Sequence, residues 1–176
     1  MRSMSESGES SAKRSFLDAV AEWRESGRPA SHVVDAAVDL VIELEAPGDS
    51  LVAVAALSTT KASVELSSVV DSALDELGCG LLRHGDPVNQ LLAGAAVANA
   101  YVLGQVELKQ LTSVAHDRFG HHSHKLLAAL ADVDDMLSTV EYFQNPKVEQ
   151  LHAKGHALAV ELLRVADAIY ERDAVT

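Results

Sequence analysis

Histidine side chains concentrate in one segment of this sequence, where together they could bind a metal ion. Four of the eight histidines fall within nine consecutive positions: His116, His121, His122 and His124. A further pair, His152 and His156, is four residues apart, a spacing that places both imidazoles on one face of a helix. Neutral imidazole is a common zinc ligand, and a zinc site needs third and fourth ligands nearby. The segment is therefore either part of a metal site or a solvated, histidine-rich junction between helices.

A second pattern of possible metal ligands is spread along the second half of the chain. It consists of His84, the adjacent pair His116 and Asp117, and Asp167. In this order, and with the local sequences Ala-His-Asp and Val-Ala-Asp-Ala-Ile, it resembles the metal ligands of HD-domain phosphohydrolases. The resemblance implies a helical enzyme in which one or two divalent ions lower the pKa of bound water for attack on nucleotide phosphate esters. It implies that these four residues are metal ligands and that a divalent metal is the cofactor.

Motifs of other enzyme classes are missing from the sequence. It contains no Gly-x-Gly-x-x-Gly, no Walker loop and no Gly-x-Ser-x-Gly turn. Cys79 is the only cysteine, and a lone cysteine near a helix end is more often inert than nucleophilic. We therefore favour a non-enzymatic protein without a cofactor. A metal-dependent phosphohydrolase is the alternative.

The charge of the chain restricts its partners. Lys and Arg number 14 and Asp and Glu number 26, so the formal net charge is 14 − 26 = −12. Nucleic acids and anionic membranes attract basic surfaces, so the negative charge disfavours both as partners. Between residues 30 and 82 there are nine acidic residues and one basic residue, Lys61.

Three of these acids form what we call the acidic ridge: Asp35, Asp39 and Glu43. Their spacing of four places them on one face of a helix, where like charges destabilise the isolated helix by a few tenths of a kcal/mol per pair, roughly. The ridge is either a solvated face or a docking face for a basic protein partner. The leading hypothesis is accordingly a regulator, adaptor or accessory subunit that acts through protein–protein contact.

Glycine, proline and capping residues divide the chain into segments with helical periodicity. The expected helices cover about residues 16–25, 31–45, 50–57, 63–77, 87–103, 107–119, 123–143 and 146–169. Residues 50–57 are a short apolar run that fits a buried strand or a buried helix, and the lack of a second strand favours helix. We expect an all-α, single-domain bundle of seven or eight helices over residues 15–176, with a polar, disordered tail at 1–14.

The last of these helices carries a continuous apolar pattern, which we call the heptad seam. Its members alternate at spacings of three and four: Val148, Leu151, Gly155, Leu158, Leu162, Val165 and Ile169. This pattern is typical of a helix packed lengthwise against another helix. The seam packs either inside the bundle, which we favour, or against a second copy in a homodimer.

The sequence also bears on location. The first residues lack the apolar stretch of a secretory signal, and the longest apolar runs are too short to cross a membrane. A single cysteine fits a reducing compartment. We expect a soluble, cytoplasmic protein.

Overall fold

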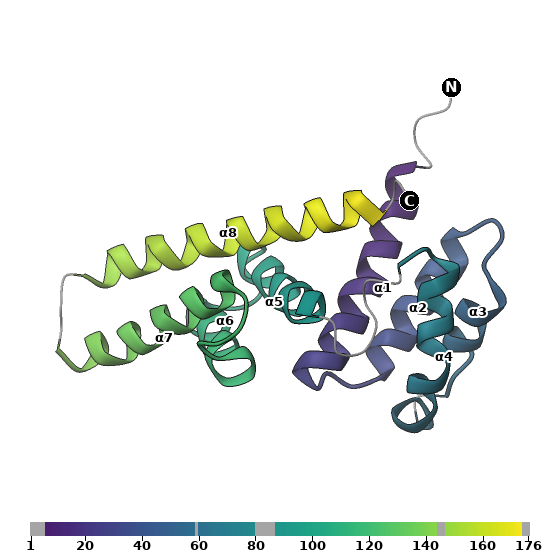
Figure 1. Ribbon diagram of the computed structural model, residues 1–176, viewed down its shortest axis with the longest axis horizontal. Helices are drawn as coiled ribbons and strands as arrows, with labels where there is room; N and C mark the ends of the chain where they lie inside the picture. Colours follow the sequence, from purple (N-terminus) through teal and green to yellow (C-terminus); the bar gives the residue numbers. More distant parts are fainter. Residues whose placement is uncertain (1–5, 59, 80–86, 144–146, 174–176) are drawn as a thin grey trace. The chain divides into compact units, whose positions relative to one another are not determined.

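The computed structural model describes residues 6–58, 60–79, 87–143 and 147–173 (Figure 1). These residues form eight α-helices and one π-helical turn, and no β-strand occurs among them. The predicted all-α class is confirmed, and the ambiguous segment at 50–57 contributes a helix. No helix in the described ranges is both long enough and apolar enough to cross a bilayer.

The helices begin and end close to the glycine, proline and capping residues that predicted their boundaries. They are α1 (Glu6–Ser26), α2 (Ser31–Glu43), α3 (Asp49–Ala55), α4 (Ala62–Glu76), α5 (Pro87–Val102), α6 (Leu108–Val114), η2 (Ala115–Phe119), α7 (Lys125–Phe143) and α8 (Val148–Asp173). Gly78, the predicted stop of α4, has φ +71°, a left-handed conformation that suits glycine. Pro87 begins α5, as predicted, because its fixed φ suits the first turn of a helix.

The start of α1 differs from the prediction. The helix begins at Glu6, so residues 6–14 of the predicted tail are helical, and residues 1–5 lie outside the described part of the chain. Ala12 is buried one turn before Phe16, and the Lys13 ammonium donates a hydrogen bond to the Leu77 carbonyl oxygen at 2.9 Å. Ala12 and the alkyl part of Lys13 contribute little to a hydrophobic pattern. The sequence of this turn therefore predicts a polar tail.

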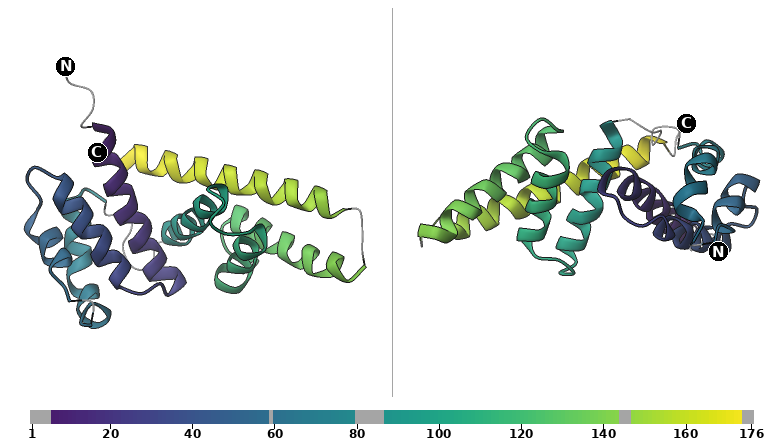
Figure 2. Two further views of the ribbon diagram at one scale, coloured as in Figure 1. Left: turned by 180° about the vertical axis from the view of Figure 1, so that it is seen from behind. Right: turned by 90° about the horizontal axis from the view of Figure 1, so that it is seen from below.

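Helix contacts divide the chain into two compact units. The first contains α1 to α4 and ends at Asn89, apart from the last few residues of the chain. In it, α1 packs on α2, α2 on α3 and α3 on α4, and neighbouring helices lie side by side in the different views (Figures 1 and 2). Its core is built around the fully buried side chains of Phe16, Leu40, Leu51, Leu66 and Leu74.

A glutamate from α4 caps the start of α3. The backbone N–H of Ser50 donates to both carboxylate oxygens of Glu76, at 2.9 and 3.1 Å, and that of Leu51 donates to Oε2 at 3.1 Å. Gly48 leaves room for this approach, because a Cβ there would lie 2.2 Å from Glu76 Oε2. Gly48 is the N-cap residue of α3, and Asp49 lies inside its first turn.

This cap predicts a pH dependence of stability. Hydrogen bonds from the side chain and backbone of Ser50, and from the Leu51 N–H, lower the pKa of Glu76 below its ordinary value of 4.5. A lowered folded-state pKa means that the ionised cap stabilises the fold above about that value and that this stability is lost as the pH falls through the folded pKa. Glu76→Gln should therefore lower the thermal midpoint at pH 7, with a difference from wild type that shrinks in acid. Glu65→Gln, an exposed glutamate on the same helix, is the control. A Glu76→Gln difference that persists unchanged in acid would contradict this role.

The second unit, residues 90–171, contains α6, η2, α7 and most of α5 and α8. Helices α5, α7 and α8 meet at Gly94, where a Cβ would lie 2.4 Å from Leu127 Cδ2 and 3.5 Å from Leu162 Cδ2. Gly155 of α8 approaches α6 in the same way, since its Cβ would lie 2.7 Å from Leu108 Cδ1. The small residues of α5 and α8 thus allow close helix packing.

The buried stripe of α8 corrects the heptad seam in part. The buried residues are Leu151, Gly155, Ala159, Leu162 and Ala166. Leu158 was expected to be as buried as Leu162, but it is only half-buried. The contacts at Gly94 and Gly155 show packing within one chain, and this packing favours the small side chains of Ala159 and Ala166 at the closest approach. Apart from Gly155, the predicted seam consists of large apolar residues, and it therefore omits the buried alanines.

Helix α6 continues into the π-helical turn η2. The Gly120 N–H donates to the Ala115 carbonyl oxygen at 2.9 Å, a bond that spans five residues and closes the turn. Gly120 has φ +68°, which only glycine adopts readily, and the chain turns there toward α7. Helix α7 packs against both α6 and η2. This corner carries the histidine-rich segment.

Candidate functional site

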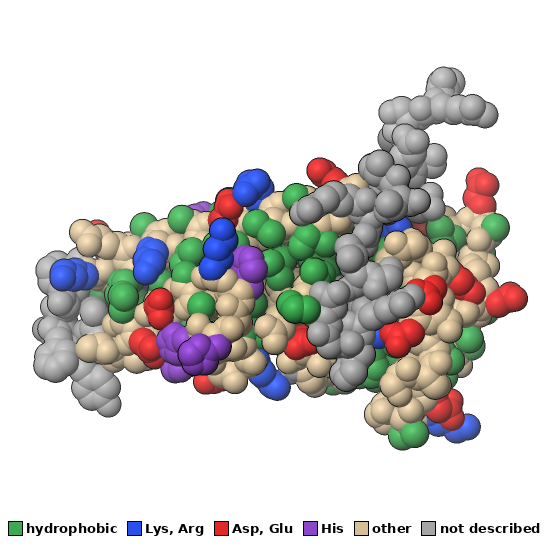
Figure 3. All heavy atoms as spheres, in the orientation of Figure 1, with side chains coloured by type: hydrophobic (Ala, Val, Ile, Leu, Met, Phe, Trp, Pro, Cys, Tyr) green, Lys and Arg blue, Asp and Glu red, His purple; other side chains and the backbone are tan. Residues whose placement is uncertain are grey.

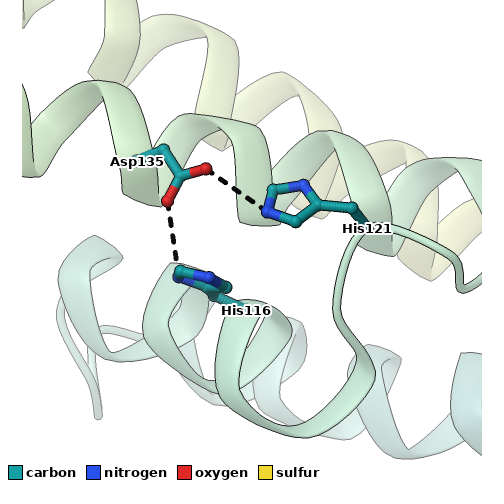
Figure 4. Close-up of side chains that lie close together, drawn as sticks. All are labelled: His116, His121 and Asp135. Atoms are coloured by element: carbon teal, nitrogen blue, oxygen red, sulfur yellow. Dashed lines mark ion pairs between the residues drawn. The ribbon is translucent and has the colours of Figure 1, made fainter.

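Two histidines and one aspartate converge at the corner between η2 and α7 (Figure 4). His116 lies on η2, His121 on the turn after Gly120, and Asp135 on α7. Asp135 Oδ1 lies 3.5 Å from His116 Nδ1, and Asp135 Oδ2 lies 3.3 Å from His121 Nε2. One nitrogen or oxygen of each side chain lies within 4.8 Å of the other two, which is close enough for the three to share a metal ion. We call these three residues the His–Asp cluster.

Two further carboxylates of α7 lie within hydrogen-bonding distance of the two histidines of the cluster. Asp132 Oδ1 lies 3.0 Å from His121 Nδ1, and Asp134 Oδ2 lies 3.3 Å from His116 Nδ1. Asp134 is buried, and its Oδ1 accepts hydrogen bonds from the hydroxyls of Thr112 (2.8 Å) and Ser113 (3.0 Å).

The environment of Asp134 keeps it ionised. Burial alone would raise the pKa of Asp134, but the hydrogen bonds from Thr112, His116 and Ser113, together with the Lys109 ammonium, outweigh this effect and lower the pKa. Asp134 is therefore a fixed negative charge that anchors α6 and η2 to α7 and orients the His116 ring. The acidic character of the corner persists at neutral pH.

The other histidines of the sequence analysis stand apart from this cluster. His122 is exposed on the turn, and the Nδ1 of His124 accepts a hydrogen bond from the Leu126 N–H at 3.4 Å near the start of α7. Burial, and then the Lys125 charge, lower the pKa of His124, which favours the neutral ring. His152 and His156 are exposed on α8, where His156 makes an edge contact with Tyr101. None of the four belongs to a group of possible metal ligands among the described residues.

The ligand set implied by the HD-domain resemblance is only partly described. His116 belongs to the His–Asp cluster, whereas Asp117 is exposed on η2 and Asp167 is half-exposed on α8, and neither joins the cluster. His84 lies outside the described residues. The carboxylates that do lie beside His116 and His121 come from α7, and the sequence analysis missed all three. Their signal was the run of acids at positions 132, 134 and 135, which follows the histidine-rich segment within about one helix length.

The space-filling view shows where histidine and acidic side chains lie together on the surface. Histidine side chains gather beside acidic ones over the part of the second unit formed by η2, its following turn and α7 (Figure 3). The side chains of His116, His121 and Asp135 are 39%, 41% and 53% exposed, so an ion in solution can reach all three. The site is open rather than enclosed.

The first unit presents a different surface, on the outer face of α2. The three residues of the acidic ridge are exposed on this helix. Val38 and Ile42 lie on the same face, because positions 35, 38, 39, 42 and 43 are three or four residues apart. Ile42 is 75% exposed and Val38 is 38% exposed. No hydrogen bond or ion pair engages the three carboxylates within the described ranges. We call these five residues the α2 face.

Comparisons with protein-family models, with curated proteins and with solved structures find no match to this chain.

Proposed function

We propose that this chain is a non-enzymatic helical protein that acts through contact with another protein, and that the α2 face is its contact surface. The observation that carries the proposal is the exposure of Ile42 between acidic residues that have no partner within the described part of the chain. A large β-branched side chain that is three-quarters exposed, next to a second apolar residue one turn earlier, offers area that a partner can bury. The proposal includes a cytoplasmic location, which agrees with a single, buried cysteine, Cys79.

The chemistry of the α2 face specifies the partner. An apolar strip along one helix, bordered by carboxylates, is complementary to an amphipathic helix whose own apolar strip is bordered by lysine or arginine. Helix α2 contains no Lys or Arg that could offset the acids. A second copy of the chain would present the same acids and would be repelled, so the fitting occupant is a different, basic protein. Two exposed apolar residues bury little area, which is typical of a transient contact.

The test measures binding of a synthetic amphipathic helix with leucine every third or fourth residue and lysines at its borders. Ile42→Ser should weaken binding by about tenfold, since losing most of the burial of one isoleucine corresponds to about 1.4 kcal/mol. Val64→Ser is the matched control, because Val64 on α4 is 77% exposed and lies outside the α2 face. Neither change should lower the thermal midpoint, since both side chains already face solvent.

Charge reversal supplies the second arm of this test. Asp39→Lys with Glu43→Lys should weaken binding of the basic helix by at least about tenfold, because attraction becomes repulsion. Glu45→Lys with Glu65→Lys changes the net charge equally at exposed positions off the α2 face and should have a much smaller effect. Equal losses in the two double variants would mean that only net charge matters, and the α2 face would not be the contact surface.

A further inference from the structure

We propose that the His–Asp cluster binds one divalent first-row metal ion of the zinc type, with His116, His121 and Asp135 as its protein ligands. This site lies in the second unit and is independent of the contact proposed for the α2 face. The first argument is distance. Zinc lies about 2.0–2.2 Å from nitrogen and oxygen ligands in a tetrahedral arrangement, so neighbouring ligand atoms are about 3.3–3.5 Å apart. Asp135 Oδ2 lies 3.3 Å from His121 Nε2 and Asp135 Oδ1 lies 3.5 Å from His116 Nδ1, so each oxygen of the carboxylate has such a separation from one histidine nitrogen.

The second argument is the placement of hydrogen-bonding groups around His121. Its Nδ1 faces Asp132 at 3.0 Å and its Nε2 faces Asp135 at 3.3 Å, so both ring nitrogens point at carboxylates. A neutral imidazole carries one N–H only, which leaves a nitrogen lone pair opposite a carboxylate oxygen. That arrangement is repulsive unless a positive charge lies between them. The charge is either a second proton on the ring or a metal ion bound to Nε2.

Net charge favours the metal ion. With neutral imidazoles, the corner holds the three carboxylates Asp132, Asp134 and Asp135 and the Lys109 ammonium, which gives −3 + 1 = −2. One divalent cation neutralises this charge. The Lys109 Nζ lies 3.8 Å from Asp134 Oδ1, whereas the other oxygen of that carboxylate, Oδ2, faces His116. The ammonium therefore does not occupy the place between the histidines and Asp135.

A neighbouring carboxylate orients one of the two histidine ligands as metal sites require. A histidine ligand usually donates its other N–H to a carboxylate, which fixes the tautomer and raises the basicity of the coordinating nitrogen. Asp132 does this for His121, since it pairs with Nδ1 and leaves Nε2 for the ion. At His116 the arrangement differs, because Asp134 Oδ2 lies 3.3 Å from Nδ1, the same nitrogen that faces Asp135. Asp134 is itself held by the hydroxyls of Thr112 and Ser113. The two rings have centroids 5.3 Å apart, so both reach the same point beside Asp135 (Figure 4).

The donor set identifies the class of metal. Two imidazoles and one carboxylate suit zinc and its first-row neighbours, whereas magnesium prefers oxygen ligands only. Three protein ligands leave a fourth tetrahedral position, which faces solvent because the cluster is exposed. That position would hold water.

The experiment titrates the full-length protein with Zn²⁺ by calorimetry and repeats the titration with Mg²⁺. We expect one equivalent of Zn²⁺ to bind and Mg²⁺ to bind far more weakly. His121→Ala and Asp135→Asn should each weaken zinc binding by at least tenfold, since even the loss of an orienting carboxylate commonly lowers metal affinity by about 10–100-fold. Asp132→Asn should weaken it within that range. Circular dichroism checks the fold of each variant, which should be unchanged because these side chains are largely at the surface.

Two controls use the same segment. His122→Ala and Asp117→Asn remove an exposed histidine and an exposed aspartate that lie outside the cluster, and zinc affinity should stay within about twofold of wild type. Equal losses for His122→Ala and His121→Ala would show unspecific chelation by the histidine-rich segment and would overturn the proposal. Wild-type protein that takes up no zinc would also overturn it.

Discussion

Leu162→Ala is expected to lower the free energy of unfolding by about 2–5 kcal/mol, the usual range for a fully buried leucine. The Leu162 side chain has no exposed surface, and it lies beside Gly94 where α5, α7 and α8 meet. Truncation would remove its apolar contacts and leave a cavity that close-packed helices cannot readily fill. Leu162→Asp should destabilise further, because its carboxylate would have no partner in apolar surroundings. Urea unfolding followed by circular dichroism measures both.

The matched control is Leu158→Ala, the same change at a half-buried position four residues earlier on α8. It should lower the free energy of unfolding by less than Leu162→Ala does. Because Leu162 packs within one chain, its loss should be the same at every protein concentration, whereas a dimer would unfold more readily on dilution. Equal effects of the two alanine variants would contradict the buried stripe described for α8.

Phe16→Ala should lower the free energy of unfolding by about 3–5 kcal/mol, the range for a buried aromatic side chain. Phe16 of α1 is fully buried in the core of the first unit. Its loss would remove the largest side chain in that core and would weaken the packing of α1 on α2. Thermal and urea unfolding give the size of the effect.

Phe16→Leu is the conservative counterpart, since it keeps most of the apolar volume and should lose much less stability than Phe16→Ala. Phe119→Ala, which truncates a half-buried phenylalanine on η2, should also have the smaller effect. A Phe16→Ala protein that unfolds like wild type would mean that α1 does not contribute to the core as its burial indicates.

Helix positions could be predicted from this sequence because local residues determine them. Gly78 ends α4 through its own left-handed backbone, and Pro87 begins α5 through its own fixed φ. The start of α1 depends instead on tertiary structure: Ala12 is buried there, and Lys13 donates a hydrogen bond to Leu77, 64 residues along the chain. A window that spans one helix contains no information about such partners.

The candidate site also combines features that local sequence predicts with features that depend on the packing of distant helices. The histidine-rich segment was visible as a composition signal, and His116 was singled out in two different patterns. Asp135 could not be paired with it, because that pairing depends on how α7 packs against η2 and on which face of α7 is turned inward. The acidic ridge was found because its three members share one helix, where spacing alone decides the shared face.

The π-helical turn makes the length of this corner matter more than the identity of most residues in it. The hydrogen bonds of a π turn span one residue more than those of an α turn. Each residue of an α-helix turns the chain by about 100°, so removing one residue between Ala115 and Phe119 would rotate His116 relative to His121 and Asp135 by roughly that angle. Within any lineage that retains the His–Asp cluster, substitutions on the exposed side of η2 should accumulate freely while insertions and deletions are eliminated. The number of residues between Leu108 and Gly120 therefore sets the geometry of the His–Asp cluster together with the identity of its three side chains.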